Sequence, residues 1–260
     1  MLNENCYIFD THAHYDSHKF SDDRDAVLSA MPDGGVGRII NCGCDIESTR
    51  FSVALAEKYD FVYAAVGIHP HDCDQWNDDF AAELGTLLAH PKVAAVGEVG
   101  LDYHYDFNPR ELQQQVFEAH IQIAKRTGYP IIIHDREAHG DMYRILRKYA
   151  PLCGVMHCFS GSVELMREAV DIGLHIGLGG SVTFKNAVHP IEVAKAVPDD
   201  RILLETDAPY MTPVPHRGKR CDSRHIEFTA HTIADARGID YHELLKLTAE
   251  NASRLFGIAL

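Results

Sequence analysis

Two histidines stand two positions apart near the start of the sequence, in the segment FDTHAHY. They follow a short apolar run that is typical of a buried β-strand. Because residues i and i+2 of a strand face the same side, the imidazoles of His12 and His14 can both reach one point at the end of that strand. The pair is either half of a metal site or two packed or exposed histidines, the commoner meaning of an isolated His-x-His.

Similar side chains recur where other apolar runs end. In chain order they are Asp10, His12, His14, His69, His71, Glu98, Asp102, His134, Asp135, His157, Glu205 and Asp207. Imidazoles and carboxylates together suit zinc, manganese or iron, and carboxylate-rich sites also accept magnesium. There are more donors than one tetrahedral ion needs, so we expect two ions that share a bridging carboxylate, with Glu98 as the bridge. Asp102 and Asp207 could instead cap a helix or a turn.

The elements that must position these residues alternate along the chain. The expected strands are Tyr7–His12, Arg38–Cys44, Phe61–Ile68, Val93–Glu98, Pro130–His134, Gly154–Cys158, His175–Leu178 and Arg201–Glu205, and the expected helices include Pro109–Thr127, Val163–Ile172, Pro190–Val197 and Ile226–Arg237. Short runs rich in Val, Ile, Ala and Leu are typical of buried parallel strands.

In a chain of 260 residues this alternation predicts an α/β fold, a single-domain (β/α)8 TIM barrel over residues 1–260. Active sites of such barrels lie at the C-terminal ends of the strands, where the histidines and carboxylates are expected. A doubly wound open sheet is the main alternative. No GxGxxG follows the first strand, so a dinucleotide-binding version of that sheet has no support.

Composition predicts a cytoplasmic protein. The seven cysteines are scattered and odd in number, which favours a reducing compartment over a disulfide framework. Cys42 and Cys44 form a Cys-x-Cys that we interpret as packing at a strand end, with a redox or metal role as the less common alternative. No apolar run reaches the roughly 18 residues of a membrane span, and Met1–Asn5 lacks the features of a signal peptide.

The sequence resembles the TatD family of metal-dependent deoxyribonucleases, within the wider group of amidohydrolase-type barrels. The resemblance covers nearly the whole chain, in the blocks DTHAHYD, VGIHPH, GEVGLDY, IIIHDREA, HCFSGS, LLETDAP and NASRLFGI. It implies a TIM-type barrel and metal-dependent cleavage of phosphodiester bonds in DNA, often as an exonuclease and in some members with RNA as substrate. Other amidohydrolase barrels bridge their ions with a carboxylated lysine, and Glu98 at this position favours the TatD branch.

The resemblance also implies roles for individual residues. His12 and His14 would bind one ion with Asp207 nearby, His134 and His157 would bind the other, and Glu98 would bridge them. Two divalent ions per chain, Mg²⁺, Mn²⁺ or Zn²⁺, are therefore expected. Some relatives lack the His-x-His pair, so its presence favours a fully populated centre. We expect a metal-activated water to cleave the phosphodiester bond, with Asp207 accepting the proton of that water, and nucleotides to be removed in the 3′-to-5′ direction.

The net charge of −14 opposes broad electrostatic binding to nucleic acid. Any phosphate chain must be held by bound cations and by local basic residues, for which the candidates are Arg136, Arg217, Lys219 and Arg220. His69 could donate a hydrogen bond to a non-bridging phosphate oxygen, or it could serve the structure beside Pro70. Where the family usually reads RGKRNEP, this chain continues from Arg220 into Cys221-Asp222-Ser223, which leaves its strand preference open.

Two other functions remain as alternatives. One is a hydrolase of an amide, ester or lactone on the same barrel, which needs the same water activation but no phosphate-binding bases. The other is a non-catalytic protein that binds metal or a partner, although such a protein has no need of Asp207. We predict DNA, with RNA as an alternative, as the substrate, no membrane and no obligate protein partner.

Overall fold

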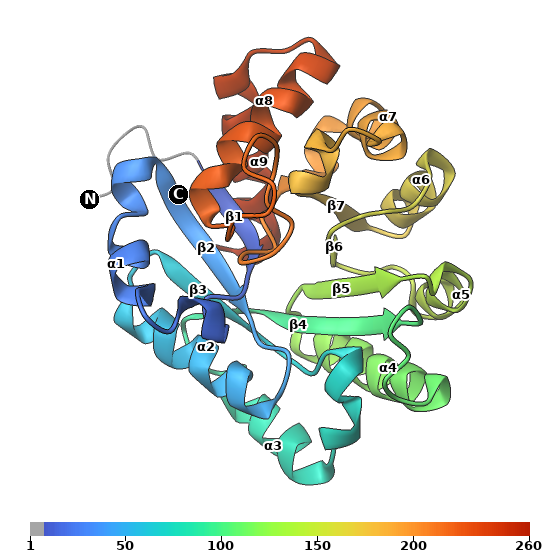
Figure 1. Cartoon of the computed structure of the whole chain (residues 1–260). Coiled ribbons are helices and arrows are strands. Elements are labelled where there is room, and N and C mark those ends of the chain that lie inside the picture. Colours follow the sequence, from blue (N-terminus) through green and yellow to red (C-terminus); the bar gives the residue numbers. More distant parts are fainter. Residues whose placement is uncertain (1–7) are drawn as a thin grey trace. The chain divides into compact units, whose positions relative to one another are not determined.

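The computed structural model describes residues 8–260, so Tyr7, the first residue of the first expected strand, and Met1–Asn5 lie outside the described residues. Within that range the strands are β1 (Ile8–Ala13), β2 (Val36–Cys42), β3 (Val62–Val66), β4 (Val93–Asp102), β5 (Ile131–Arg136), β6 (Gly154–Met156), β7 (Leu174–Leu178) and β8 (Ile202–Leu204). The α-helices are α1 (Arg24–Ser29), α2 (Ile46–Lys58), α3 (Asp78–Leu87), α4 (Arg110–Thr127), α5 (His139–Tyr149), α6 (Val163–Asp171), α7 (Val188–Ala196), α8 (Ile226–Arg237) and α9 (Tyr241–Phe256). Figure 1 shows this alternation along the chain.

The strands belong to one sheet whose order follows the sequence from β1 to β8. The pairings of β3 with β4, β4 with β5, β5 with β6 and β7 with β8 are all parallel. A parallel bridge between Ala13 and Ala208 joins the end of β1 to the segment after β8. Sequential order with the first and last strands joined is the topology of a (β/α)8 barrel, so the predicted fold is confirmed and the doubly wound sheet is excluded.

The chain forms two compact units. Unit 1 comprises the described part of Met1–Ile40 together with Cys158–Arg167 and Ile176–Leu260, and unit 2 comprises Asn41–His157 with Glu168–His175. Every residue of β1, in unit 1, and of β4, in unit 2, is buried, as expected for parallel strands covered on both faces. In unit 2, α2 packs along β3 and α4 along β4 (Figure 1).

The element boundaries differ from the expected ones mainly where the functional residues lie. Strands β6 and β8 end at Met156 and Leu204, directly before a histidine and a glutamate that the sequence pattern placed within the strands. Strand β4 runs on to Asp102 through a shift in register between Val96 and Val99. Helix α7 starts at Val188, two residues before the expected start at Pro190. Proline is tolerated there because the N–H groups of the first helical turn have no partner within the helix.

Two glycines allow close approaches beside these strand ends. A Cβ on Gly100 would lie 2.0 Å from the carbonyl oxygen of His134, so only glycine lets β4 lie against β5 at this point. In unit 1, a Cβ on Gly177 would lie 2.4 Å from Oε2 of Glu205. Both glycines therefore make room for functional candidates. No helix within residues 8–260 is long and apolar enough to cross a membrane.

Candidate metal centre

Glu98 is the centre of a group of imidazoles in unit 2. The buried carboxylate comes from β4, and its Oε1 lies 2.9 Å from Nδ1 of His134 and 3.2 Å from Nε2 of His157. Nε2 of His69 lies 3.7 Å from the same oxygen. The ligand atoms of His69, Glu98 and His134 all lie within 4.8 Å of one another, close enough to hold an ion. The donor set, imidazole nitrogens around a carboxylate oxygen, suits a divalent metal.

Asp102 orients His134 from the other side of its ring. Oδ2 of Asp102 accepts hydrogen bonds from Nε2 of His134 at 3.2 Å and from Nε2 of His71 at 2.9 Å. Burial alone would raise the pKa of the Asp102 carboxyl, but hydrogen bonds, the strongest from His134, hold it below its usual range. With its proton on Nε2, His134 can present the lone pair of Nδ1 beside Glu98. A carboxylate that fixes a histidine tautomer in this way is typical of metal sites.

His69 has the opposite arrangement of donor and acceptor. Its Nδ1 accepts the backbone N–H of His71 at 3.1 Å, so in the neutral ring Nε2 carries the proton. Burial and the neighbouring His134 lower the pKa of His69 well below its ordinary value, which keeps the ring neutral. A protonated Nε2 beside Glu98 can donate a hydrogen bond but cannot bind a metal. In this tautomer His69 would serve as a hydrogen-bond donor, although its Nε2 lies near enough to Glu98 and His134 to join a metal site.

In unit 1 the two histidines of the opening motif converge. Their Nε2 atoms lie 3.0 Å apart, and Oδ1 of Asp207 lies 3.4 Å from Nε2 of His14 and 3.9 Å from Nε2 of His12. Asp207 adopts a left-handed backbone conformation with φ of 60°, which aspartate tolerates better than most residues. Two imidazole nitrogens and a carboxylate oxygen facing one point form a second donor set for a divalent ion.

Asp10, which the sequence pattern includes among the strand-end side chains but assigns to neither ion, ties β1 to the segment after β8. It is fully buried and accepts hydrogen bonds from the backbone N–H and the hydroxyl of Thr206 and from the hydroxyl of Ser223. Burial raises its pKa to about 7, although these hydrogen bonds act in the opposite direction. Because Thr206 directly precedes Asp207, this network sets where Asp207 stands relative to His12.

The same network accounts for the unusual Cys221-Asp222-Ser223 segment. Ser223 bonds to Asp10 and also to the hydroxyl of Tyr15, at 2.8 Å. The Asp222 carboxylate accepts the backbone N–H and the guanidinium of Arg224. Cys221 is buried. The side chains that depart from the family pattern are thus engaged in holding the segment in place.

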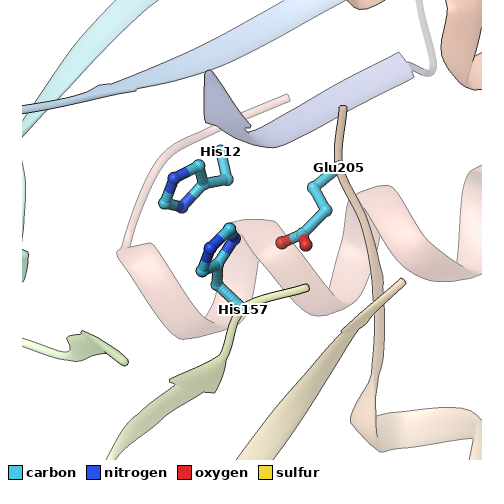
Figure 2. A group of neighbouring side chains, drawn as sticks. All are labelled: His12, His157 and Glu205. Atoms are coloured by element: carbon cyan, nitrogen blue, oxygen red, sulfur yellow. The ribbon is translucent and has the colours of Figure 1, made fainter. Parts of the chain in front are cut away.

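Glu205 and Cys44 are two further residues beside the donor sets. Figure 2 draws His12 and Glu205 of unit 1 with His157, and the side chains of His12 and Glu205 extend from β1 and from the segment after β8. Oε1 of Glu205 accepts the backbone N–H of Cys158, which gives this carboxylate a structural partner. In unit 2 the thiol of Cys44 donates to Oε2 of Glu98 at 3.7 Å. The thiol of Cys44 therefore makes a hydrogen bond to the expected bridging carboxylate, in addition to packing at the end of its strand.

The four basic candidates differ in how strongly they are engaged. The guanidinium of Arg136 lies 4.8 Å from the ring centre of Tyr105. Arg217 lies over Phe184 and donates to a backbone carbonyl, and Lys219 is exposed. Arg220 makes two hydrogen bonds of 2.7 Å to the carboxylate of Asp23. Arg220 would have to release Asp23 before it could bind a phosphate.

Fold and donor sets together define a metal-dependent hydrolase of the (β/α)8 barrel class. The chain belongs to the TatD family: the family described as TatD related DNase matches residues 9–257.

The similar proteins agree with this assignment. Bacillus subtilis (strain 168) has a relative named uncharacterized metal-dependent hydrolase YabD, which is 42% identical over 96% of this chain and 99% of its own. The 3'-5' ssDNA/RNA exonuclease TatD of Musicola paradisiaca is 34% identical over 96% and 97% of the two chains. The crystal structure of YJJV, a TatD homolog from Escherichia coli K12, superposes with a TM-score of 0.92 at 33% identity, covering 98% of this chain and 99% of that one.

Proposed function

We propose that this protein hydrolyses phosphodiester bonds in nucleic acid as a metal-dependent nuclease that removes nucleotides from the 3′ end of single-stranded DNA or RNA. The observation that carries the proposal is the pair of donor sets, one around Glu98 and one around Asp207. The substrate class follows the names of the family and of the Musicola paradisiaca relative.

Two divalent ions would be held by these residues. His12, His14 and Asp207 would hold one ion, His134 and His157 would hold the other, and Glu98 would be shared between them. When bound, such ions lower the pKa of a water molecule and neutralise charge on the phosphate oxygens. The donor sets fit this role, because the hydrogen bond from Nε2 of His134 to Asp102 leaves Nδ1 facing Glu98, where an ion could replace its proton.

The protein's own side chains would complete the reaction. The carboxylate of Asp207, beside the His-x-His pair, orients the attacking water and accepts its proton. His69 donates its Nε2 hydrogen to a non-bridging phosphate oxygen, as its tautomer permits. Arg136, Arg217 and Lys219 attract the phosphate chain, and Arg220 joins them when it leaves Asp23.

We further propose that residues 1–260 act as a single domain in the cytoplasm, without an obligate protein partner. An acidic protein that attracts phosphate only through a few basic side chains and bound cations is suited to binding the end of a nucleic-acid strand rather than a long duplex. Zinc and manganese match the mixed imidazole and carboxylate donors, and magnesium would be bound mainly through the carboxylate oxygens.

Degradation of end-labelled oligonucleotides tests the proposal. Protein stripped of metal is supplied with Mg²⁺, Mn²⁺ or Zn²⁺ and mixed with single- and double-stranded DNA and RNA, and with small amide, ester and lactone substrates. We expect progressive shortening of single strands from the 3′ end. Turnover of the amide, ester or lactone substrates alone would instead identify an amidohydrolase-type activity. No turnover of any substrate would indicate a metal-binding protein.

A further inference from the structure

Two aromatic rings are exposed in the loop between β4 and α4, within unit 2. The side chains of Tyr105 and Phe107 are 48% and 67% exposed. The two rings stack on each other, with centroids 5.3 Å apart and planes inclined by 27°. Large aromatic side chains that remain in water are a common mark of a binding surface. We call these two residues the aromatic platform.

The aromatic platform is in direct contact with the histidine group around Glu98. The ring of His71 stands edge-on to Tyr105 at 5.2 Å and to Phe107 at 4.9 Å. His71 donates to Asp102, the same carboxylate that orients His134. One imidazole therefore separates the platform from the side chains that position a metal ligand. A group stacked on the platform would lie beside the reaction site.

The charges around the platform favour a phosphate-bearing ligand. The guanidinium of Arg136 lies 4.8 Å from the ring centre of Tyr105. Of the nearby carboxylates, Asp106 is paired with Arg110, and Glu137 lies within hydrogen-bonding distance of the His104 ring. The positive charge of Arg136 is thus available beside an aromatic surface. Aromatic rings next to a positively charged side chain are the combination that proteins use to hold single-stranded nucleic acid.

We propose that the aromatic platform stacks with an unpaired nucleobase at the end of a single-stranded substrate, while Arg136 contacts an adjacent phosphate. The inference rests on the proposed nuclease function and names how that site selects its substrate. A base in a duplex is already stacked and paired, so the platform favours single strands over blunt duplexes. Stacking needs only the flat face that every base has, so it tolerates any sequence.

Equilibrium binding separates this proposal from the proposed function. The probe is a fluorescein-labelled oligothymidylate with phosphorothioate linkages that resist cleavage, and its partner probe carries abasic sites at the 3′ end. Fluorescence anisotropy with the Mg²⁺-loaded full chain measures the Kd of both. Phe107→Ala and Tyr105→Ala should each raise the Kd for the intact probe about tenfold and leave the Kd for the abasic probe unchanged.

Phe51→Ala is the matched control, because Phe51 is an exposed phenylalanine on α2 of the same unit. It should change neither Kd. Arg136→Ala should flatten the dependence of log Kd on log salt concentration, since it removes a positive charge that binds phosphate. Phe107→Ala should leave that slope unchanged.

The outcomes are distinct. Equal losses with both probes, or no loss with either, overturn the platform. A change of oligomeric state in Phe107→Ala, seen by sedimentation and without a base-dependent loss of binding, makes the face a protein contact and also overturns it. A wild-type protein that binds the intact probe in preference to the abasic probe, yet never shortens an unmodified strand, overturns the nuclease function and supports the platform.

Discussion

The imidazole of His134 lies between two carboxylates, which set its orientation. Its Nε2 proton is held by Asp102 and its Nδ1 faces Glu98. Burial would lower the pKa of His134, but the hydrogen bonds to Asp102 and Glu98 outweigh it and raise the pKa. Binding of an ion at Nδ1 would replace a proton there, so metal affinity should increase with pH.

Glu98→Ala tests the bridging role. If Glu98 contacts both ions, this variant should lose both, whereas His12→Ala should weaken mainly one. Metal content after gel filtration, measured by mass spectrometry and expressed per chain, gives the answer. His189→Ala, an exposed histidine on α7, is the control and should keep the wild-type content. Glu98→Ala protein that still retains two ions would rule out the bridge.

Asp207→Asn tests the proton acceptor. Asparagine keeps the size and one oxygen of the side chain but cannot accept a proton. We expect the fold to persist and kcat on oligonucleotides to fall by roughly 10²-fold or more, the usual scale for the loss of a general base. Circular dichroism and metal content serve as controls. Near-normal kcat would transfer the role to another group, of which Glu205 is the next candidate.

At the scale of elements, helix α4 carries a buried histidine that the proposed reaction does not use. His120 is fully buried, its Nδ1 donates to the carbonyl of Val116 at 2.8 Å, and its ring lies 4.4 Å from that of Trp76. Burial lowers the pKa of His120 to about 4. The ring is therefore neutral in the folded protein at a pH where an exposed histidine would be charged.

His120 should make stability depend on pH. Between about 6.5 and about 4 the unfolded chain binds a proton at this residue and the folded chain does not, so acidification favours unfolding. The effect is on the order of 3 kcal/mol when complete. Urea unfolding at several pH values should show a shallower loss of stability for His120→Leu than for the wild type. The exposed His189→Leu should follow the wild-type curve, and identical curves for all three proteins would contradict the assignment.

At the scale of the whole molecule, the net charge of −14 must be overcome locally. Arg217, Lys219 and Arg220 follow β8 in the sequence, but Arg220 is paired with Asp23. Pairing with a carboxylate leaves less positive field for a phosphate chain than the sequence suggests. The strength of binding should therefore depend on whether this ion pair opens.

Replacement of Arg217, Lys219 and Arg220 by alanine should raise KM for oligonucleotides and flatten its salt dependence, by about 0.7 in slope for each phosphate that the loop no longer binds. Asp23→Asn is the complementary variant, because it removes the carboxylate that pairs with Arg220 and keeps all three basic side chains. It should lower KM for oligonucleotides. Hydrolysis of bis-p-nitrophenyl phosphate, a small diester that needs little grip, separates the possible roles. Equal losses on both substrates in the triple variant would mean that the loop supports the metal site. An unchanged KM in both variants would mean that other residues bind the oligonucleotide.

The sequence by itself determined the class of fold and predicted which side chains could serve as metal donors. Alternating short apolar runs and amphipathic stretches predict a parallel barrel, because burial and periodicity are local properties of the chain. The convergence of His12 and His14 also followed from the sequence, since the period of two in a strand is local.

Only the tertiary structure decided which atoms face each donor. Asp102 lies 32 residues from His134 in the sequence, and Asp10 lies 213 from Ser223, so no local pattern could reveal these hydrogen bonds. The same holds for Arg220, whose guanidinium looked available until folding brought it to Asp23. Hydrogen bonds and ion pairs depend on distances of a few ångströms between segments far apart in the chain, and such distances are set by packing rather than by composition.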